Sequence, residues 1–230
     1  MLKNASIVFD LDGTLVDTAP DLTNTLNHVL EAHGHEPVPA ACVREAVGRG
    51  AKAMIEQALG MANAESDTER MLADFLAHYE TNIAVESRPF PGAVEALERL
   101  TAAGARLAVC TNKRERLTHL LLQALEIDHY FTAVSGRDTL GVSKPDPRHL
   151  LGTIAAMDGR PSRAVMVGDS TVDLQAAEGA GVPSVLVSFG YCPPPPEGPR
   201  PDAVIDHFDE LEERALALLK RLTEKAGTPS

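Results

Sequence analysis

Short apolar runs and helical patterns alternate along most of the chain, from residue 92 onward. Residues 106–110 and 164–167 have the length and composition of buried strands, whereas residues 114–125 repeat leucine at helical spacing. This alternation is typical of a parallel sheet flanked by helices, so we predict an α/β fold. The other expected strands are 133–135, 184–187 and 203–205, and the other expected helices are 92–103, 147–157, 172–180 and 210–225.

One segment near the N-terminus interrupts this alternation. Residues 17–85 contain helical patterns and no convincing strand, and they follow the first apolar run and its turn directly. A helical insert at this place predicts a cap over the strand ends, with links at 16–20 and 86–92. The alternative is a set of helices packed onto the sheet within one compact domain. The predicted helices of the insert are 22–32, 43–47, 52–59 and 68–83.

The acidic composition excludes several classes of partner. The 230 residues carry a formal net charge of −12 and have an isoelectric point near 5.1, which argues against nucleic acid or an anionic membrane surface as a partner.

No apolar stretch approaches the ~20 residues of a membrane-spanning helix. Acidic residues interrupt the only early apolar run, so we expect no signal peptide. Three widely spaced cysteines fit a reducing compartment, and we expect a cytoplasmic protein.

The first apolar run ends in two carboxylates, Asp10 and Asp12, and the turn residues Gly13 and Thr14 follow. The carboxyl ends of strands are where open α/β sheets bind ligands. Two neighbouring acids repel each other unless a cation or a proton lies between them, so the pair indicates a hard metal ion. The other interpretation is a strand followed by an ordinary turn, since Asp and Gly are common there.

Further reactive groups follow later apolar runs. Thr111 and Asn112 come after residues 106–110, Lys144 lies in a loop, and Asp169 and Asp173 come after residues 164–167. Each of them alone is an ordinary cap, turn former or surface charge. Their order and their placement at strand ends together favour a catalytic site.

These motifs resemble those of the haloacid dehalogenase-like superfamily of phosphohydrolases, over nearly the whole chain. Residues 10–14 resemble its first motif, Thr111 the second, Lys144 the third and residues 168–173 the fourth. Within the superfamily the chain is most similar to the phosphoglycolate phosphatase group. The segments that carry this closer resemblance are 15–22, 47–50, 90–93, 111–113 and 201–206.

The resemblance implies a Rossmann-like core, residues 1–16 and 86–230, with a mobile helical cap of residues 17–85. It also implies Mg²⁺ held by Asp10, Asp169 and the backbone carbonyl of Asp12. The carboxylate of Asp10 can attack phosphorus and form an aspartyl-phosphate. Asp12 can protonate the leaving alkoxide and then deprotonate water.

The remaining candidate residues would bind the substrate or support those that do. The Thr111 hydroxyl and the backbone N–H of Asn112 can donate to phosphate oxygens, and Lys144 can stabilise the transition-state charge. We expect Asp173 to orient Lys144 or a metal-bound water. Arg49 lies in a glycine-flanked turn and is the candidate contact for a substrate carboxylate, the alternative being a solvated loop charge.

We therefore expect a Mg²⁺-dependent phosphoric monoester hydrolase that acts on a small phosphorylated metabolite, as a monomer or homodimer. The first expected reaction is 2-phosphoglycolate to glycolate and phosphate. A phosphosugar mutase, a sugar phosphatase and a pyrophosphatase on the same scaffold are alternatives. A non-catalytic binding module would not need the complete set of reactive residues. A dehalogenase would leave Asp12 and the metal-site acids without a role.

Overall fold

A parallel sheet forms the centre of the computed structural model, which describes residues 2–62, 64, 66–195 and 197–226. Within these residues the sheet has six strands in the order β5-β4-β1-β6-β7-β8, and each neighbouring pair is parallel. This confirms the predicted α/β fold. The strands are β1 (Ser6–Phe9), β4 (Arg106–Cys110), β5 (Phe131–Ser135), β6 (Ala164–Gly168), β7 (Ser184–Val187) and β8 (Ala203–Ile205).

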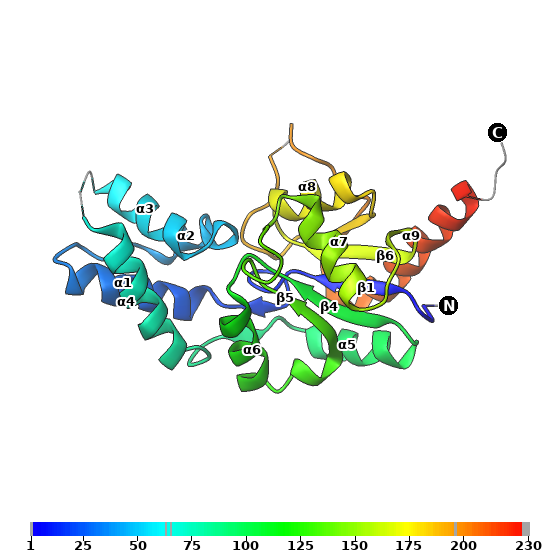
Figure 1. The fold of residues 1–230 in the computed structure, drawn as a ribbon, viewed down its shortest axis with the longest axis horizontal. Helices are drawn as coiled ribbons and strands as arrows, with labels where there is room; N and C mark the ends of the chain where they lie inside the picture. Colours follow the sequence, from blue (N-terminus) through cyan, green and yellow to red (C-terminus); the bar gives the residue numbers. More distant parts are fainter. Residues whose placement is uncertain (1, 63, 65, 196, 227–230) are drawn as a thin grey trace.

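Helices cover both faces of the sheet (Figure 1). Successive residues of a strand point to opposite faces. Accordingly, Ile7 and Phe9 of β1 belong to the apolar cluster with α5, α6 and α9, whereas Val8 belongs to the cluster with α7 and α8. The helices are α5 (Ala93–Ala102), α6 (Glu115–Ala124), α7 (Pro147–Ala156), α8 (Thr171–Ala180) and α9 (Leu211–Ala226), and the short 3₁₀ helices are Asp128–Tyr130, Pro161–Arg163 and Phe208–Glu210.

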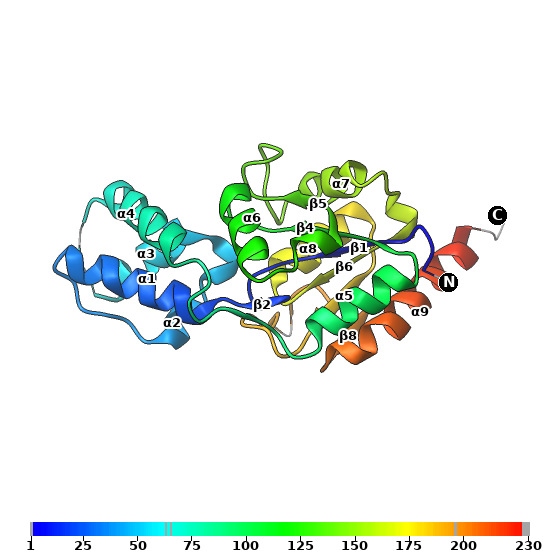
Figure 2. The same cartoon turned by 90° about the horizontal axis from the view of Figure 1, so that it is seen from below.

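A separate group of helices lies beyond one end of the sheet (Figures 1 and 2). It has an apolar cluster of its own, which includes Leu26, Ile55 and Phe75, and α6 adds Leu117 to that cluster. The first helix begins at Ala19 rather than at residue 22, because Pro20 suits a first helical turn. The group comprises α1 (Ala19–Ala32), α2 (Ala40–Arg44), the 3₁₀ turn η1 (Val47–Arg49), α3 (Ala51–Met61) and α4 (Thr68–Thr81).

Two chain segments join this group to the sheet, and they pair with each other. Strand β2 (Val16–Asp17) is antiparallel to β3 (Arg88–Pro89). No strand was predicted here, because a two-residue strand has no detectable alternation of apolar and polar positions. Asp21 strengthens the junction: its buried carboxylate accepts hydrogen bonds from the backbone N–H groups of Glu86 and Ser87, at 3.0 and 2.8 Å.

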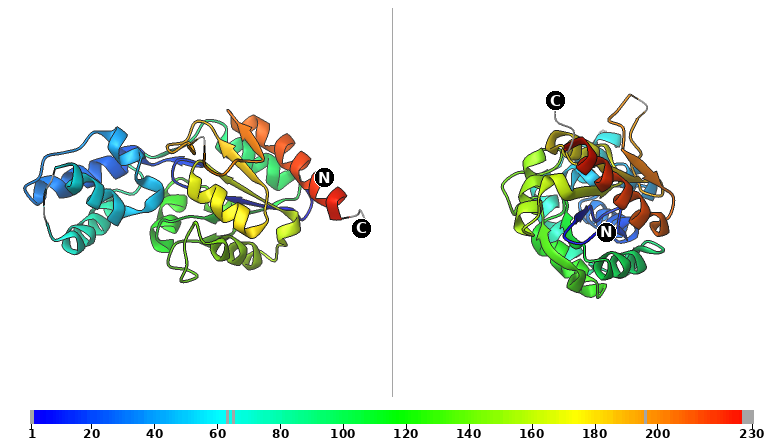
Figure 3. Two further views of the ribbon diagram at one scale, coloured as in Figure 1. Left: turned by 90° about the horizontal axis from the view of Figure 1, so that it is seen from above. Right: turned by 90° about the vertical axis from the view of Figure 1, so that its right-hand side faces the viewer.

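The two ends of the sheet face different parts of the molecule. The start of the chain and α9 lie at the end of the sheet away from the helices α1–α4 (Figure 3). The helices within the described ranges are too short or too polar to cross a membrane. The carboxyl ends of β1, β4 and β6 point toward the helical group, so any site at these strand ends faces it.

Candidate active site

The candidate catalytic residues meet because three adjacent parallel strands end at the same edge. In the register of the sheet, Phe9 of β1 lies beside Val109 of β4 and Val167 of β6. Asp10, Thr111 and Asp169 follow these strands closely, so they lie next to one another beyond the strand ends. The strand order reverses at β1, and such a switch point is where doubly wound sheets bind ligands.

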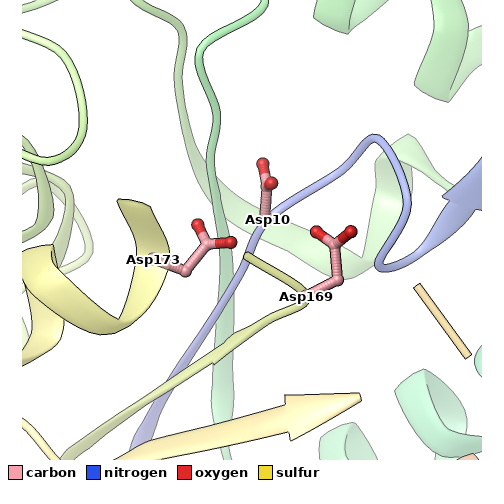
Figure 4. Close-up of side chains that lie close together, drawn as sticks. All are labelled: Asp10, Asp169 and Asp173. Atoms are coloured by element: carbon pink, nitrogen blue, oxygen red, sulfur yellow. The ribbon is translucent and has the colours of Figure 1, made fainter. Parts of the chain in front are cut away.

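Three buried carboxylates converge at this edge (Figure 4). Asp10, Asp169 and Asp173 each place one oxygen within 4.8 Å of the others. Burial, with the charges of Asp173 and Asp169, raises the pKa of Asp10 to about 7, although Lys144 opposes the shift. Burial and Asp173 raise the pKa of Asp169 to about 6. The acids therefore lack sufficient positive charge around them, and a divalent cation would offset this deficit.

The contacts of these acids divide them into different roles. Both oxygens of Asp173 are engaged, one by Lys144 Nζ at 2.6 Å and the other by the N–H and hydroxyl of Ser170 at 3.1 and 2.6 Å. Asp169 accepts single hydrogen bonds, from Thr14 Oγ1 at 3.2 Å and from the N–H of Tyr191 at 2.8 Å. This arrangement fits Asp169 as a metal ligand and Asp173 as a residue that positions Lys144.

Lys144 is the cation of this cluster. Its ammonium lies 2.8 Å from Asp10 Oδ1 and 2.6 Å from Asp173 Oδ1, and the residue is 3% exposed. Burial lowers its pKa, but the carboxylates of Asp10 and Asp173 raise the pKa above its ordinary value, so the ammonium stays charged. The N–H of Leu11 also donates to Asp10 Oδ1, at 2.7 Å. Within the described chain the other oxygen of Asp10 has no hydrogen-bond partner, so it is free for a cation.

Asp12 does not belong to this cluster of three acids and has partners of its own. Its Oδ1 accepts hydrogen bonds from the Thr18 hydroxyl and from Lys113 Nζ, both at 2.7 Å. Sequence reasoning assigned no role to Lys113, although this residue belongs to the T-N-K segment. A lysine two residues after Thr111 was the available signal, but its pairing with a residue 101 positions away is visible only in the fold.

Thr111 and Asn112 lie at the end of β4, as expected. Thr111 is buried, and its hydroxyl oxygen accepts a hydrogen bond from the N–H of Lys113 at 3.2 Å. The Asn112 side chain has a role that was not predicted: its Nδ2 donates to the carbonyls of Gly48 and Lys144, both at 3.0 Å. Asn112 thereby connects the helical group to the loop that carries Lys144.

A cavity of about 490 Å³ lies between the strand ends and the helical group. On the sheet side it is lined by Asp12, Asn112 and Lys113. On the helical side its walls are largely apolar and include Leu22, Val47, Met54 and Phe75. The proposed acid–base residue, Asp12, therefore faces a space that can enclose a small organic molecule.

The structure does not bring Arg49 into this cavity. Arg49 is exposed in the 3₁₀ turn η1, and its guanidinium donates to Gln57 Oε1 of α3. Gly50, the next residue, does line the cavity and has a φ of +92°. The expected turn is therefore present, but its cation lies outside the cavity, and the substrate-binding role of Arg49 stays a prediction.

Comparisons with known proteins agree with this geometry. A family model described as haloacid dehalogenase-like hydrolase matches residues 7–187. A phosphoglycolate phosphatase from Mesorhizobium japonicum is 46% identical over 224 residues, which are 96% of this chain and 97% of that protein. One from Caulobacter vibrioides is 47% identical over 221 residues, 95% of this chain and 93% of that protein.

Solved structures give the same result. The crystal structure of a predicted phosphoglycolate phosphatase from Haemophilus somnus aligns with a TM-score of 0.85 at 30% identity, over 93% of this chain and 98% of that one. The resemblance to the phosphoglycolate phosphatase group is thus confirmed, and so is the expected enzyme class, a phosphoric monoester hydrolase. The chain belongs to the haloacid dehalogenase-like hydrolase family.

Proposed function

We propose that the protein is a Mg²⁺-dependent phosphatase that hydrolyses 2-phosphoglycolate to glycolate and phosphate through an aspartyl-phosphate on Asp10. The observation that carries the proposal is the set of groups around Asp10: Lys144 Nζ at 2.8 Å, the hydroxyl of Thr111 beyond the adjacent strand, and the second acid Asp12. The similarity to proteins named phosphoglycolate phosphatase supports the choice of substrate.

In the first step the Asp10 carboxylate attacks phosphorus, and the bond to the leaving oxygen breaks. Lys144 neutralises charge on the transferring group, and the Thr111 hydroxyl and the Asn112 N–H donate to its oxygens. Asp10, Asp169 and the backbone carbonyl of Asp12 would hold Mg²⁺. When bound, Mg²⁺ supplies positive charge that brings the anionic nucleophile and phosphate together.

In the second step the aspartyl-phosphate is hydrolysed. Asp12 has given its proton to the leaving alkoxide and now takes one from the attacking water. Hydrogen bonds from Thr18 and Lys113, both at 2.7 Å, fix the position of this carboxylate. The opposite face of the phosphorus is then open to water, and hydrolysis restores the Asp10 carboxylate.

Residues 17–85 would act as a cap that closes over this site. Their connection to the core includes the β2–β3 pair and the Asp21 contacts, and Asn112 bridges the two parts at 3.0 Å from the Gly48 carbonyl. A cap that opens at this junction would admit the substrate and, on closing, would limit the access of water to the reacting groups. The large apolar share of the cavity wall comes from this cap.

Phosphate release from a panel of phosphorylated metabolites, with Mg²⁺ and with chelator, tests the proposal. The panel contains 2-phosphoglycolate, sugar phosphates and pyrophosphate. We expect the highest kcat/KM with 2-phosphoglycolate and no activity with chelator. Asp10→Asn should lower kcat by at least ~10³-fold with an unchanged circular dichroism spectrum, because an amide cannot form the acyl-phosphate. More than trace turnover by this variant would exclude Asp10 as the nucleophile.

A further inference from the structure

The strand next to β4 delivers a cation to the same edge of the sheet. Arg137 follows β5 by two residues, and β5 is the outer neighbour of β4. Neighbouring strands lie ~5 Å apart, so the backbone here is about one strand spacing from Thr111 and two from Asp10. Arg137 also lines the cavity. A Cβ built on Gly50 would lie 2.7 Å from Arg137 Nη1 and 3.8 Å from the carbonyl oxygen of Asn112, so the guanidinium lies near Asn112 at the end of β4.

The loop that carries Arg137 is held firmly. The N–H of Gly136 donates to Thr139 Oγ1 at 2.8 Å, and the Thr139 hydroxyl donates to Glu115 Oε2 at 2.7 Å. The N–H of Arg137 donates to the Lys113 carbonyl at 3.0 Å. A Cβ on Gly136 would lie 2.2 Å from the backbone nitrogen of Glu115, so the loop packs directly on the start of α6. The side chain of Arg137 therefore projects from a fixed base.

Arg137 also differs in its ion pairing from the lysines that line the cavity. Lys113 pairs with Asp12 at 2.7 Å, and Lys52 pairs with Glu69 at 2.5 Å. Among the residues that the structure describes, no carboxylate lies within ion-pair distance of the Arg137 guanidinium. Its Nη1 instead approaches Gly50 of the cap: a Cβ added there would be 2.7 Å away. The absence of a side chain at Gly50 thus leaves room for this guanidinium.

Asn112, which also lines the cavity, has a buried polar atom without a partner in the described part of the chain. Asn112 Oδ1 is buried and accepts no hydrogen bond within the described ranges. The orientation of the amide is fixed, because Nδ2 donates to two carbonyls and the flipped amide would place an oxygen against both of them. A buried acceptor without a donor costs free energy, and a substrate would relieve that cost only with a group that donates a hydrogen bond, such as a hydroxyl, and not with its carboxylate.

We propose that the cavity binds the alcohol part of the substrate, and that Arg137 selects substrates by binding a carboxylate on that part. This inference rests on the proposed phosphatase function. A guanidinium matches a carboxylate with two parallel hydrogen bonds. The volume of about 490 Å³ lies within the range of ~300–1,000 Å³ for pockets that enclose drug-sized ligands. With apolar walls, the cavity accepts carboxylated phosphomonoesters larger than 2-phosphoglycolate.

Two pairs of substrates test the role of Arg137 because the members of each pair have nearly the same size and shape but differ in the charge of one group. The small pair is 2-phosphoglycolate and its amide, and the large pair is 4-carboxyphenyl phosphate and 4-carbamoylphenyl phosphate. We expect the wild type with Mg²⁺ to prefer the acid by about 10- to 100-fold in kcat/KM in both pairs, the range of a charged hydrogen bond. Arg137→Ala should abolish this preference through KM, and Arg137→Lys should restore part of it.

The amides report directly on catalysis, so a failure of the proposed function is distinct from a failure of this inference. Hydrolysis of neither pair by the wild type would contradict the phosphatase function. Arg137→Ala should lose far more kcat/KM on the acids than on the amides, whereas Arg160→Ala, whose arginine is exposed at a different loop, should hydrolyse both within about twofold of the wild type. Arg114 also lines the cavity. A preference for the acids that persists in Arg137→Ala, or that is lost in Arg49→Ala or Arg114→Ala instead, would overturn the inference. An equal loss on acid and amide would also overturn it.

Discussion

At the scale of single residues, the site depends on how a few buried charges are paired. Lys144 contacts Asp10 and Asp173, whereas Lys113 contacts Asp12. The two acids of the first motif are therefore held by different lysines, which come from different strand ends. This separation explains how two carboxylates two positions apart can perform different tasks. Asp10 lies in the cluster of three buried acids, while Asp12 faces the cavity.

The buried His149 of α7, near Lys144, should make the stability of the folded protein depend on pH. Its Nε2 lies 3.1 Å from the Gly136 carbonyl, and burial, with the nearby charge of Lys144, lowers its pKa from 6.5 to about 4. Between these values the unfolded chain binds a proton that the folded protein does not. The contribution of His149 to stability is therefore fully present above pH 6.5 and is lost as the pH falls toward 4.

We predict that His149→Gln, which can still donate to this carbonyl but does not titrate, removes this pH dependence. The free energy of unfolding of the wild type relative to the variant should fall by on the order of 2 kcal/mol between pH 7 and pH 4. Urea denaturation at a series of pH values measures the difference. A difference that stays constant over this range would contradict the lowered pKa.

The types and the order of the site residues were predictable from the sequence, but most of their ion pairs and hydrogen bonds were not. Asp10, Thr111, Lys144 and Asp169 were identified because each follows an apolar run or precedes a helix start. The roles of Lys113 and Arg137 depend on contacts between distant parts of the chain, which no local pattern records. For Arg49 the sequence left two alternatives, a substrate contact and a solvated loop charge, and its exposed position is visible only in the fold.

At the scale of elements, the limits of a strand were predicted correctly where its burial requires a run of apolar residues. Strands β4, β7 and β8 have the expected limits, since each is a short apolar run between turns. β5 begins two residues earlier than expected, at Phe131, because its first residues are only partly buried and lack a continuous apolar run. The pair β2–β3 was not predicted, because its stability comes from tertiary contacts and not from its own sequence.

The junction formed by these strands yields a prediction about stability. The Asp21 carboxylate accepts hydrogen bonds from two backbone N–H groups, those of Glu86 and Ser87, and from the Ser87 hydroxyl at 2.7 Å. Asp21→Ala would leave these donors without a partner in a buried place. We expect a loss of about 2–3 kcal/mol in the free energy of unfolding, measured with urea. The matched control is Glu86→Ala, which removes an exposed contact with Asn24 and should cost less than ~0.5 kcal/mol. Equal effects of the two variants would exclude a special role of Asp21.

At the scale of the whole molecule, the net charge of −12 and the cluster of buried acids at the site both favour the binding of a cation. Cytoplasmic location and a monomeric or homodimeric state stay predictions. The sheet brings Asp10, Asp169 and Asp173 together from two strand ends and one helix, and within the described residues Lys144 is the cation that pairs with Asp10 and Asp173. The fold therefore concentrates repulsion between carboxylates at its central switch point, where a bound divalent cation would stabilise it most.

This arrangement predicts that Mg²⁺ stabilises the folded protein in the absence of any substrate. A ligand that binds only the folded state stabilises it by about 2.7 kcal/mol at a hundred times its Kd. We expect the melting temperature to rise with Mg²⁺ concentration and to fall again with chelator, as measured by differential scanning calorimetry. Asp169→Asn should abolish this rise, because the amide loses the charge of a proposed ligand. Glu178→Gln, which removes an exposed acid from α8, should respond as the wild type does. A melting temperature that Mg²⁺ leaves unchanged in the wild type, or raises equally in Asp169→Asn, would exclude the proposed metal site.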